Sequence, residues 1–321
     1  GELSTPSAGT SNVRIGVNAG NSITSGGNFN VVVGDEAGTA LTTGDSNIAI
    51  GFEALSTEDA NGNNVAVGYR ALKTLNAGAD SYNVAVGSTA GTAITTGIRN
   101  TLIGGVAGLV LTDADFNVAI GMNALSTDTL GSKSTAVGTD ALQTQNFTSA
   151  TDSFNTAVGY NAGNAVTTGL RNTLIGGLAG DALTDADDNV AIGQQSLSSD
   201  TLGSGAVAIG HNALFSQNFT SATTNYNVAI GYKTGEAVTT GTNNTIIGGL
   251  AGDAATTATG ITLLGKAAGS AITTGGDNTG LGTQALKSTT TGTSNVAVGK
   301  DALEANTTAS NNTAVGFKAL E

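Results

Sequence analysis

A glycine that returns at a nearly constant spacing runs through this chain and constrains its fold more than any other feature. It occurs 18 times, and 13 of the 17 intervals between successive copies have the same length, a period of 17, as from Gly34 to Gly51. A period this short and this persistent is typical of a solenoid, in which each repeat forms one coil stacked on the next. We call this residue the pivot glycine, and it stands at Gly16, Gly34, Gly51, Gly68, Gly87, Gly104, Gly121, Gly138, Gly159, Gly176, Gly193, Gly210, Gly231, Gly248, Gly265, Gly282, Gly299 and Gly316.

The residues around the pivot glycine form a recurring unit. The residue before it is aliphatic in all 18 copies, the third residue before it is Val, Ile or Thr, and Ala usually stands between them. Asn occupies the fourth position before the pivot in 15 copies, and Ala the third position after it in 16. Large β-branched and aliphatic residues at alternate positions predict a short strand. The sequence therefore predicts an all-β fold, a β-solenoid of about 18 coils that covers residues 1–321 as one repetitive domain.

Within this strand we expect the aliphatic pair to face inward and fill the core, and the intervening Ala to face a close neighbour. On this interpretation Ile175→Asp would bury an unpaired charge. The Asn column predicts a ladder, because each side chain can bond its own turn and the Asn of the coils above and below. We assign structural roles to six asparagines and six pivot glycines: Asn83, Asn100, Asn117, Asn155, Asn172, Asn189, Gly87, Gly104, Gly121, Gly159, Gly176 and Gly193.

A second regularity concerns the volume of the core. The fourth residue after the pivot is always Gly or Leu. The seventh is apolar after Gly, as in Gly38 and Leu41, and usually polar after Leu, as in Leu125 and Asp128. We infer that each coil has room for one more large apolar side chain, which comes from either position. From about residue 83 the coils also form a 72-residue super-repeat, and its longest coil carries an insert that should bulge outward.

Composition and motifs argue against several classes of function. The net charge of −13 disfavours nucleic acid and anionic membranes as partners. No segment is long and apolar enough to insert into a bilayer. The only histidine is His211, and the glycine-rich strings lack the lysine and the strand–helix context of a phosphate-binding loop. We therefore predict that the chain is not an enzyme, has no catalytic or cofactor-binding residues and needs no cofactor.

Two minor site predictions come from side-chain chemistry. Asp113 and Asp115 recur one super-repeat later as Asp185 and Asp187, and closely spaced carboxylates in a turn are weak candidates for calcium, with a solvated turn as the alternative. Asn146 and Asn218 each begin an Asn-Phe-Thr sequon within the predicted bulges. These two residues are candidate glycosylation sites.

A column of threonines suggests an alternative function. Thr stands eight residues after the pivot in 13 of 17 copies, including Thr24, Thr95 and Thr239. A flat threonine ladder on a β-solenoid can bind ice, so an ice-binding protein is the alternative interpretation. A glycan-cleaving tailspike is a third class, which would need paired carboxylates on adjacent coils. The sequence shows no distinctive pair of that kind.

The unit N-T-A-V-G-[YF]-x-A, as in Asn155–Ala162 and Asn312–Ala319, resembles the head repeats of trimeric autotransporter adhesins and the repeats of bacteriophage tail fibres. The resemblance covers about residues 12–320. It implies a β-roll or β-helix shaft, often with three chains side by side, that serves in attachment. The adhesin head repeat is shorter than the repeat of this chain, so the handedness of its coil does not carry over.

These observations lead to one expected function. We expect a structural component of an extracellular fibre or adhesin, at a cell surface or on a virion, that provides a rigid shaft and an attachment surface. Expected partners are further copies of the chain in a side-by-side homotrimer, and a cell-surface glycan or protein receptor. Joining Glu321 to Gly1 would complete a coil as long as the two longest ones, which suggests end-to-end stacking into filaments. Arbitrary boundaries within a longer repetitive chain are the alternative.

Overall fold

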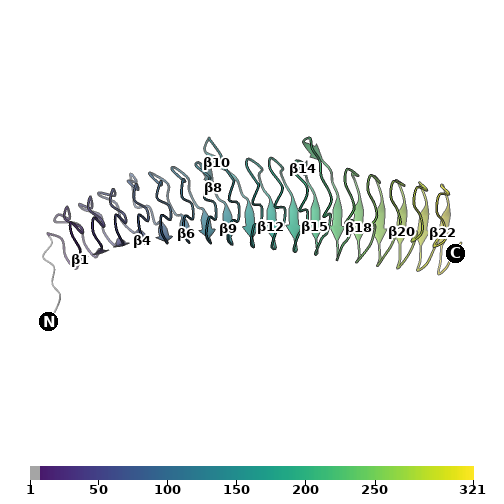
Figure 1. The fold of residues 1–321 in the computed structure, drawn as a ribbon, viewed down its shortest axis with the longest axis horizontal. Helices are drawn as coiled ribbons and strands as arrows, with labels where there is room; N and C mark the ends of the chain where they lie inside the picture. Colours follow the sequence, from purple (N-terminus) through teal and green to yellow (C-terminus); the bar gives the residue numbers. More distant parts are fainter. Residues whose placement is uncertain (1–7) are drawn as a thin grey trace. The chain divides into compact units, whose positions relative to one another are not determined.

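The computed structural model describes residues 8–321, and these form a parallel β-solenoid of 18 coils (Figure 1). The predicted fold class and period are confirmed. The chain divides into two compact units between residues 157 and 158, and each is described by itself. One three-residue strand precedes each pivot glycine, so every coil contributes one strand to its unit.

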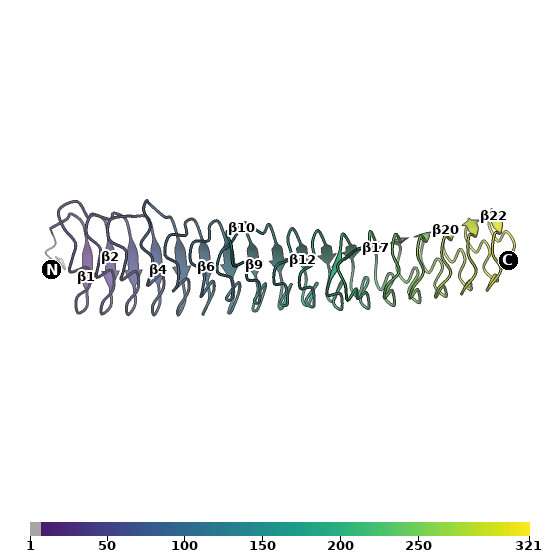
Figure 2. The same cartoon turned by 90° about the horizontal axis from the view of Figure 1, so that it is seen from above.

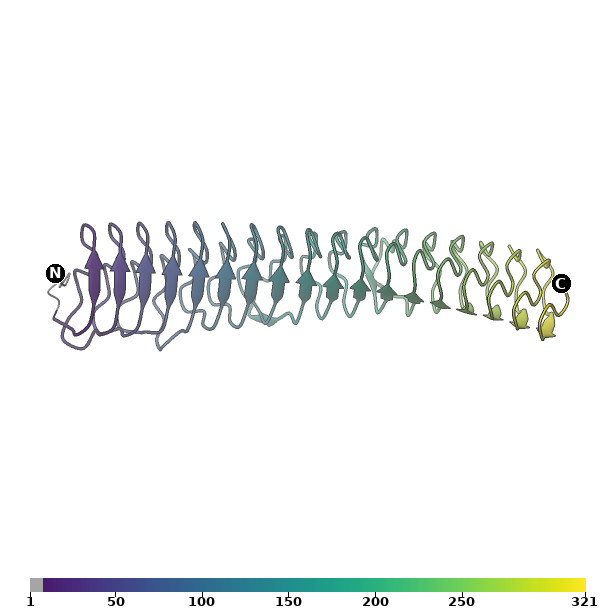
Figure 3. The ribbon, with the colours of Figure 1, turned by 90° about the horizontal axis from the view of Figure 1, so that it is seen from below.

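In the first unit these strands pair in parallel, each with the strand one coil further on. Register is residue for residue, so that Val31 lies opposite Ile48 and Val33 opposite Ile50. Figure 3 shows the arrows of this unit standing side by side in one row. The strands are β1 (Val13–Ile15), β2 (Val31–Val33), β3 (Ile48–Ile50), β4 (Val65–Val67), β5 (Val84–Val86), β6 (Thr101–Ile103), β7 (Val118–Ile120) and β9 (Thr135–Val137).

The second unit repeats this arrangement. Thr173 lies opposite Val190 and Ile175 opposite Ile192, and the same register continues to the last strand. Figure 2 shows the strands of this unit following one another along its length. The division between the units falls within β11 (Thr156–Val158). The strands that follow are β12 (Thr173–Ile175), β13 (Val190–Ile192), β15 (Val207–Ile209), β17 (Val228–Ile230), β18 (Thr245–Ile247), β19 (Thr262–Leu264), β20 (Thr279–Leu281), β21 (Val296–Val298) and β22 (Thr313–Val315).

Each unit carries one bulging insert, as the sequence predicts. In the first unit β8 (Gly131–Ser132) pairs in parallel with β10 (Thr151–Asp152). In the second, β14 (Gly203–Ser204) pairs in the same way with β16 (Thr223–Thr224). The loops that lead into β10 and β16 extend beyond the neighbouring coils of their own unit (Figure 1).

The orientation of the strand residues is the reverse of the sequence-based prediction. The middle residue of every three-residue strand except β1, where it is Arg14, is buried, and Ala49, Leu102 and Leu174 are all fully buried. The aliphatic residues on either side of it point outward and are partly exposed, as Ile103 and Ile175 show. We call the middle residue the inner position and its two neighbours the outer positions. The prediction that Ile175→Asp would bury a charge is therefore wrong, because Ile175 is 38% exposed.

The interior of a coil explains this reversal. A Cβ atom added at Gly280, which occupies an inner position, would lie 3.1 Å from Leu263 Cδ2 and 3.3 Å from Leu286 Cδ1. The inner position therefore faces the large side chain that the turn supplies four residues after the pivot. Since that side chain already fills the narrow interior, the nine coils with Leu four residues after the pivot carry only Ala or Gly at the inner position.

The predicted exchange between the fourth and seventh positions is confirmed and extends to the inner position. A Cβ atom at Gly38 would lie 2.8 Å from Leu41 Cδ1, and one at Gly180 would lie 2.7 Å from Leu174 Cδ2. An inner Leu or Ile occurs only in coils with Gly four residues after the pivot. The residue pairs are Leu102 with Gly108, Leu174 with Gly180, Ile246 with Gly252 and Leu263 with Gly269.

Candidate functional site

The asparagine column forms the predicted ladder inside the first unit. Asn100 donates its backbone N–H to Asn83 Oδ1 at 2.9 Å, and its own Oδ1 accepts the backbone N–H of Asn117 at 3.0 Å. Its Nδ2 donates to the carbonyl of Ala114 at 2.7 Å. All three asparagines are fully buried. Each side chain thus links two neighbouring coils through polar groups that would otherwise be buried without partners.

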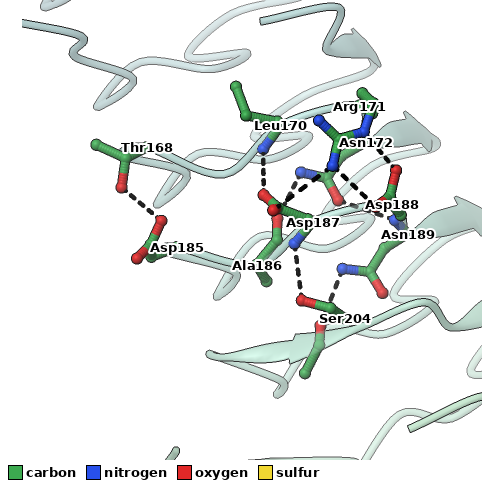
Figure 4. A network of polar contacts seen from close by, with 11 residues as sticks. Thr168, Leu170, Arg171, Asn172, Asp185, Ala186, Asp187, Asp188, Asn189 and Ser204 are labelled. Atoms are coloured by element: carbon green, nitrogen blue, oxygen red, sulfur yellow. Dashed lines mark hydrogen bonds and ion pairs between the residues drawn. The ribbon is translucent and has the colours of Figure 1, made fainter. Parts of the chain in front are cut away.

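The second unit continues the same pattern. Asn172 Oδ1 accepts the N–H of Asn189 at 3.1 Å, while Asn172 Nδ2 donates to the carbonyl of Ala186 at 2.7 Å (Figure 4). Residues other than Asn can stand at some positions of the column. The Oδ1 of the preceding asparagine needs only a backbone N–H from the next coil, and any residue except proline supplies one. Asn189 accepts the N–H of Ala206 in this way, at 2.9 Å, and Asn244 accepts that of Ile261 at 3.1 Å.

Buried carboxylates anchor the two inserts, a feature that the sequence analysis missed. Asp128 is fully buried, and its Oδ1 accepts the N–H groups of Gly131 and Phe147, both at 3.0 Å. Its Oδ2 accepts Gln145 Nε2 at 2.6 Å. Asp200 makes the same three bonds in the other unit, with Gly203, Phe219 and Gln217. The sequence signal for these anchors is a polar residue at the seventh position after the pivot. This position points into the coil, so a polar residue there needs hydrogen-bond partners in the interior.

The sequons lie beside these anchors. Asn146 Oδ1 accepts the hydroxyl of Thr129 at 3.0 Å, and Asn218 Oδ1 accepts that of Thr201 at 3.1 Å. Thr148, the third residue of the first sequon, is exposed. Glycosylation of either asparagine stays a prediction.

A third buried carboxylate, Glu58, makes longer hydrogen bonds. Its Oε1 accepts the N–H groups of Asp59 at 3.2 Å and Asn61 at 3.3 Å, and its Oε2 accepts the N–H of Ala77 at 3.3 Å. Burial raises the pKa of Glu58 above its ordinary value, because desolvation disfavours the carboxylate more than these donors favour it.

The raised pKa of Glu58 predicts a pH-dependent loss of stability. The folded chain holds this proton more tightly than the unfolded chain, so the contribution of Glu58 to folding decreases as the pH rises from 4.5 through the raised folded-state pKa. The contribution of Glu58 to the free energy of unfolding should fall by about 1.4 kcal/mol for each pH unit by which its folded-state pKa exceeds its unfolded-state pKa. Urea unfolding of the parent and of Glu58→Gln, compared from about pH 4 to about pH 8, measures it. The free energy of unfolding of the parent minus that of the variant should fall as the pH rises. A difference that stayed constant or rose with pH would contradict the prediction.

The four aspartates proposed for calcium lie in turns and bond to the preceding coil. Asp185 Oδ1 accepts the hydroxyl of Thr168 at 2.7 Å, and Asp187 Oδ1 accepts the N–H of Leu170 at 2.8 Å (Figure 4). In the first unit Asp113 bonds to the Thr96 hydroxyl at 2.6 Å and Asp115 to the Ile98 N–H at 2.8 Å. Across residues 8–321, no three acidic, histidine or cysteine side chains are placed to share a metal ion.

An ion pair completes the network around Asp187. Arg171 Nε donates to Asp188 Oδ1 at 2.6 Å, and a guanidinium nitrogen lies 3.7 Å from Asp187 Oδ2 (Figure 4). The guanidinium lowers the pKa of Asp188 and the carboxylate raises that of Arg171. These contacts use the carboxylates to satisfy donors of a neighbouring coil.

The threonine column, on which the alternative ice-binding interpretation rests, makes hydrogen bonds within the fold. Most of its hydroxyls donate to backbone carbonyls of the next coil. Thr112 Oγ1 donates to the carbonyl of Thr129 at 3.1 Å, and Thr256 Oγ1 donates to that of Thr273 at 3.1 Å. The same bond joins Thr184 to Thr201 at 3.0 Å. A hydroxyl that donates to the next coil is less available to order water at the surface.

The described part of the chain contains no pocket. His211, the only histidine, stacks on Tyr232 with ring centroids 5.5 Å apart. None of residues 8–321 belongs to a helix with the length and apolar character needed to span a membrane. The surface features that stand out are therefore repetitive rather than concave.

The most prominent of these features is an apolar face over the strands. Among the described residues, 21 large hydrophobic side chains are exposed, and all but Leu320 occupy an outer position or one of two flanking positions. We define the flanking positions as the fifth residue before and the first residue after the pivot. The side chains at these positions are Val13, Ile15, Val17, Phe29, Ile50, Phe52, Tyr69, Tyr82, Ile103, Phe116, Met122, Phe154, Val158, Tyr160, Ile175, Tyr226, Tyr232, Leu264, Val315 and Phe317.

Comparison of the chain with protein-family models, with curated proteins and with solved structures gives no match. The class of protein is therefore defined by the fold and its internal ladders. The chain is a parallel β-solenoid with a repeat of about 17 residues, in which asparagine ladders run through the interior of each unit.

Proposed function

We propose that this chain is a structural component of an extracellular fibre or adhesin, at a cell surface or on a virion, where it acts as a rigid shaft with an attachment surface. The observation that carries the proposal is the uniform bonding between coils. Backbone groups, buried asparagines and threonine hydroxyls all bond to the adjacent coil, as Asn100 and Thr112 show. In such a stack each coil is held by bonds to the coil on either side.

The same bonding supports a role that depends on length and repetition more than on a single site. Side-by-side association as a homotrimer would stiffen such a shaft. Each chain would present two similar loops, its exposed inserts, as binding sites for a receptor. The receptor would be either a cell-surface glycan or a protein. Loops held on a rigid scaffold are where binding residues usually lie.

Electron microscopy combined with limited proteolysis tests this proposal. We expect elongated particles that survive a broad-specificity protease under conditions that digest a globular control of similar size. Compact particles, or rapid cleavage throughout the coils, would overturn it. A thermal-hysteresis measurement addresses the ice-binding alternative, for which the engaged threonine hydroxyls predict no activity.

A further inference from the structure

The strands of each unit present an apolar face that nothing in the described chain covers. The outer positions of the 18 strands give 36 residues, of which 28 are Val, Ile or Leu and the other eight are Thr. None of them is charged, although the chain as a whole has a net charge of −13. Monomeric proteins rarely leave an uninterrupted apolar surface of this kind exposed to water.

Aromatic residues occur along both borders of this face, among charged and small residues. All five tyrosines and five of the eight phenylalanines occupy flanking positions, and each is exposed. Phe52 and Tyr69 stack on each other across neighbouring coils, with ring centroids 5.7 Å apart. Aromatic side chains are enriched in protein–protein interfaces relative to the rest of the surface. Ten of the 13 aromatic residues of the chain thus lie outside the core, where a partner can contact them.

We propose that this outer face is the surface on which a second copy of the same chain docks, sheet against sheet. The inference rests on the proposed fibre function and names a surface through which two of its chains pair side by side. Three properties of the face favour a second copy over another occupant: its lack of charge, its axial repeat and its area.

The lack of charge on the face limits repulsion between two copies. Two chains that each carry −13 repel one another wherever their acidic surfaces meet. Contact through the outer positions, none of which is ionisable, keeps the carboxylates of both copies in water. The acidic residues of the turns, such as Asp113 and Asp185, lie away from the strands and stay solvated in such a pair.

The axial repeat of the face determines which partner surface can fit against it. Parallel strands lie about 4.8 Å apart, so the outer side chains form ridges with that spacing along each unit. A second copy presents ridges with the same spacing, and these can fit between the ridges of the first over many successive coils. A partner with a different backbone repeat would lose this fit after a few coils.

The area of the face is comparable to that of a stable interface. A three-residue strand about 10 Å long and a coil spacing of about 4.8 Å give about 48 Å² of face for each coil. Summed over the coils of both units, this is about 860 Å² per copy. A stable interface of standard size buries about 800 Å² on each partner. The outer positions of the two units together therefore have the area of an interface of standard size.

Light scattering on three proteins tests the inference. The parent should elute with a mass of at least twice 31.2 kDa at micromolar concentration. Ile103→Lys combined with Ile120→Lys places two charges on the face, and this variant should elute at 31.2 kDa with an unchanged circular dichroism spectrum. Because both side chains point outward, the lysines can reach water in the separate chain. Thr43→Lys combined with Thr57→Lys, at exposed positions away from the face, should keep the parent mass.

Several outcomes would overturn the inference. A parent that stays at 31.2 kDa, or a face variant that keeps the parent mass, contradicts docking on this surface. A monomeric parent that floats with vesicles of uncharged lipid would show that the face binds a lipid surface instead. Single, protease-resistant elongated particles would refute the docking surface and leave the fibre proposal standing, whereas compact particles would refute the fibre proposal itself.

Discussion

Leu174→Asp should unfold the coils around β12, whereas Ile175→Asp, one residue away, should leave them folded. Leu174 is fully buried in the interior, and an aspartate there has no partner for its charge. We expect a cost of about 4–5 kcal/mol, at the upper end of what single substitutions produce. Ile175 is 38% exposed on the outer face, so its aspartate stays in contact with water. Its cost should be about 1 kcal/mol or less.

Hydrogen exchange followed by mass spectrometry is the suitable measurement, because a solenoid can open locally without unfolding throughout. Peptides from β12 and the coils beside it should lose protection in Leu174→Asp only. The comparison should be made at concentrations where the chain is monomeric, so that loss of association does not add to the effect of Ile175→Asp. Equal loss of protection in both variants would contradict the assignment of the inner and outer positions.

Gly104→Ala should destabilise the first unit strongly, whereas Gly105→Ala should be tolerated. The φ angle of Gly104 is 139°, a conformation that residues with a side chain rarely adopt. An added Cβ atom would lie 2.4 Å from the carbonyl oxygen of Gly121, the pivot of the next coil. Strain in the backbone and this contact together should cost about 3 kcal/mol or more, because neither coil can move without breaking its bonds to its neighbours.

Gly105 provides a matched control because it has the same residue type and the same substitution. No heavy atom lies within 4 Å of the position that its Cβ would take. Its replacement should change the free energy of unfolding by about 0.5 kcal/mol or less. Urea unfolding of the two variants gives the comparison. If Gly104→Ala unfolded at the same urea concentration as Gly105→Ala, the pivot glycine would not be required for close stacking.

Several features of the interior could be predicted from the sequence because they depend on spacing. The regular interval between pivot glycines determines the number of coils and their parallel stacking. The asparagine column predicts its own ladder, since in-register stacking brings each amide next to the one above. The interior volume of a coil is constant, and the sequence shows this. The large apolar side chain comes from the seventh position after the pivot in the pair Gly38 and Leu41, and from the fourth position in the pair Leu125 and Asp128. Each of these follows from repetition along the chain.

The buried carboxylates were harder to predict. Glu58, Asp128 and Asp200 occupy the inward position seven residues after the pivot, but a polar residue there could equally lie in a solvated turn. Only the folded insert brings the N–H of Phe147 to Asp128 and the N–H of Phe219 to Asp200. These bonds join residues on different coils, and the length of an insert does not say how its backbone folds back.

The sequence by itself determined the period, the coil count, the strand positions and the ladder, because these follow from which residues recur and at what spacing. The tertiary structure alone decided which side of each strand lies inside. Alternation in a segment such as Thr173–Ile175 separates two faces but does not say which is covered. The usual preference for aliphatic residues in the core points the wrong way here. The side chains that the turns supply already fill the narrow interior of each coil, so the strand contributes mostly alanine to the core and turns its valines and isoleucines outward.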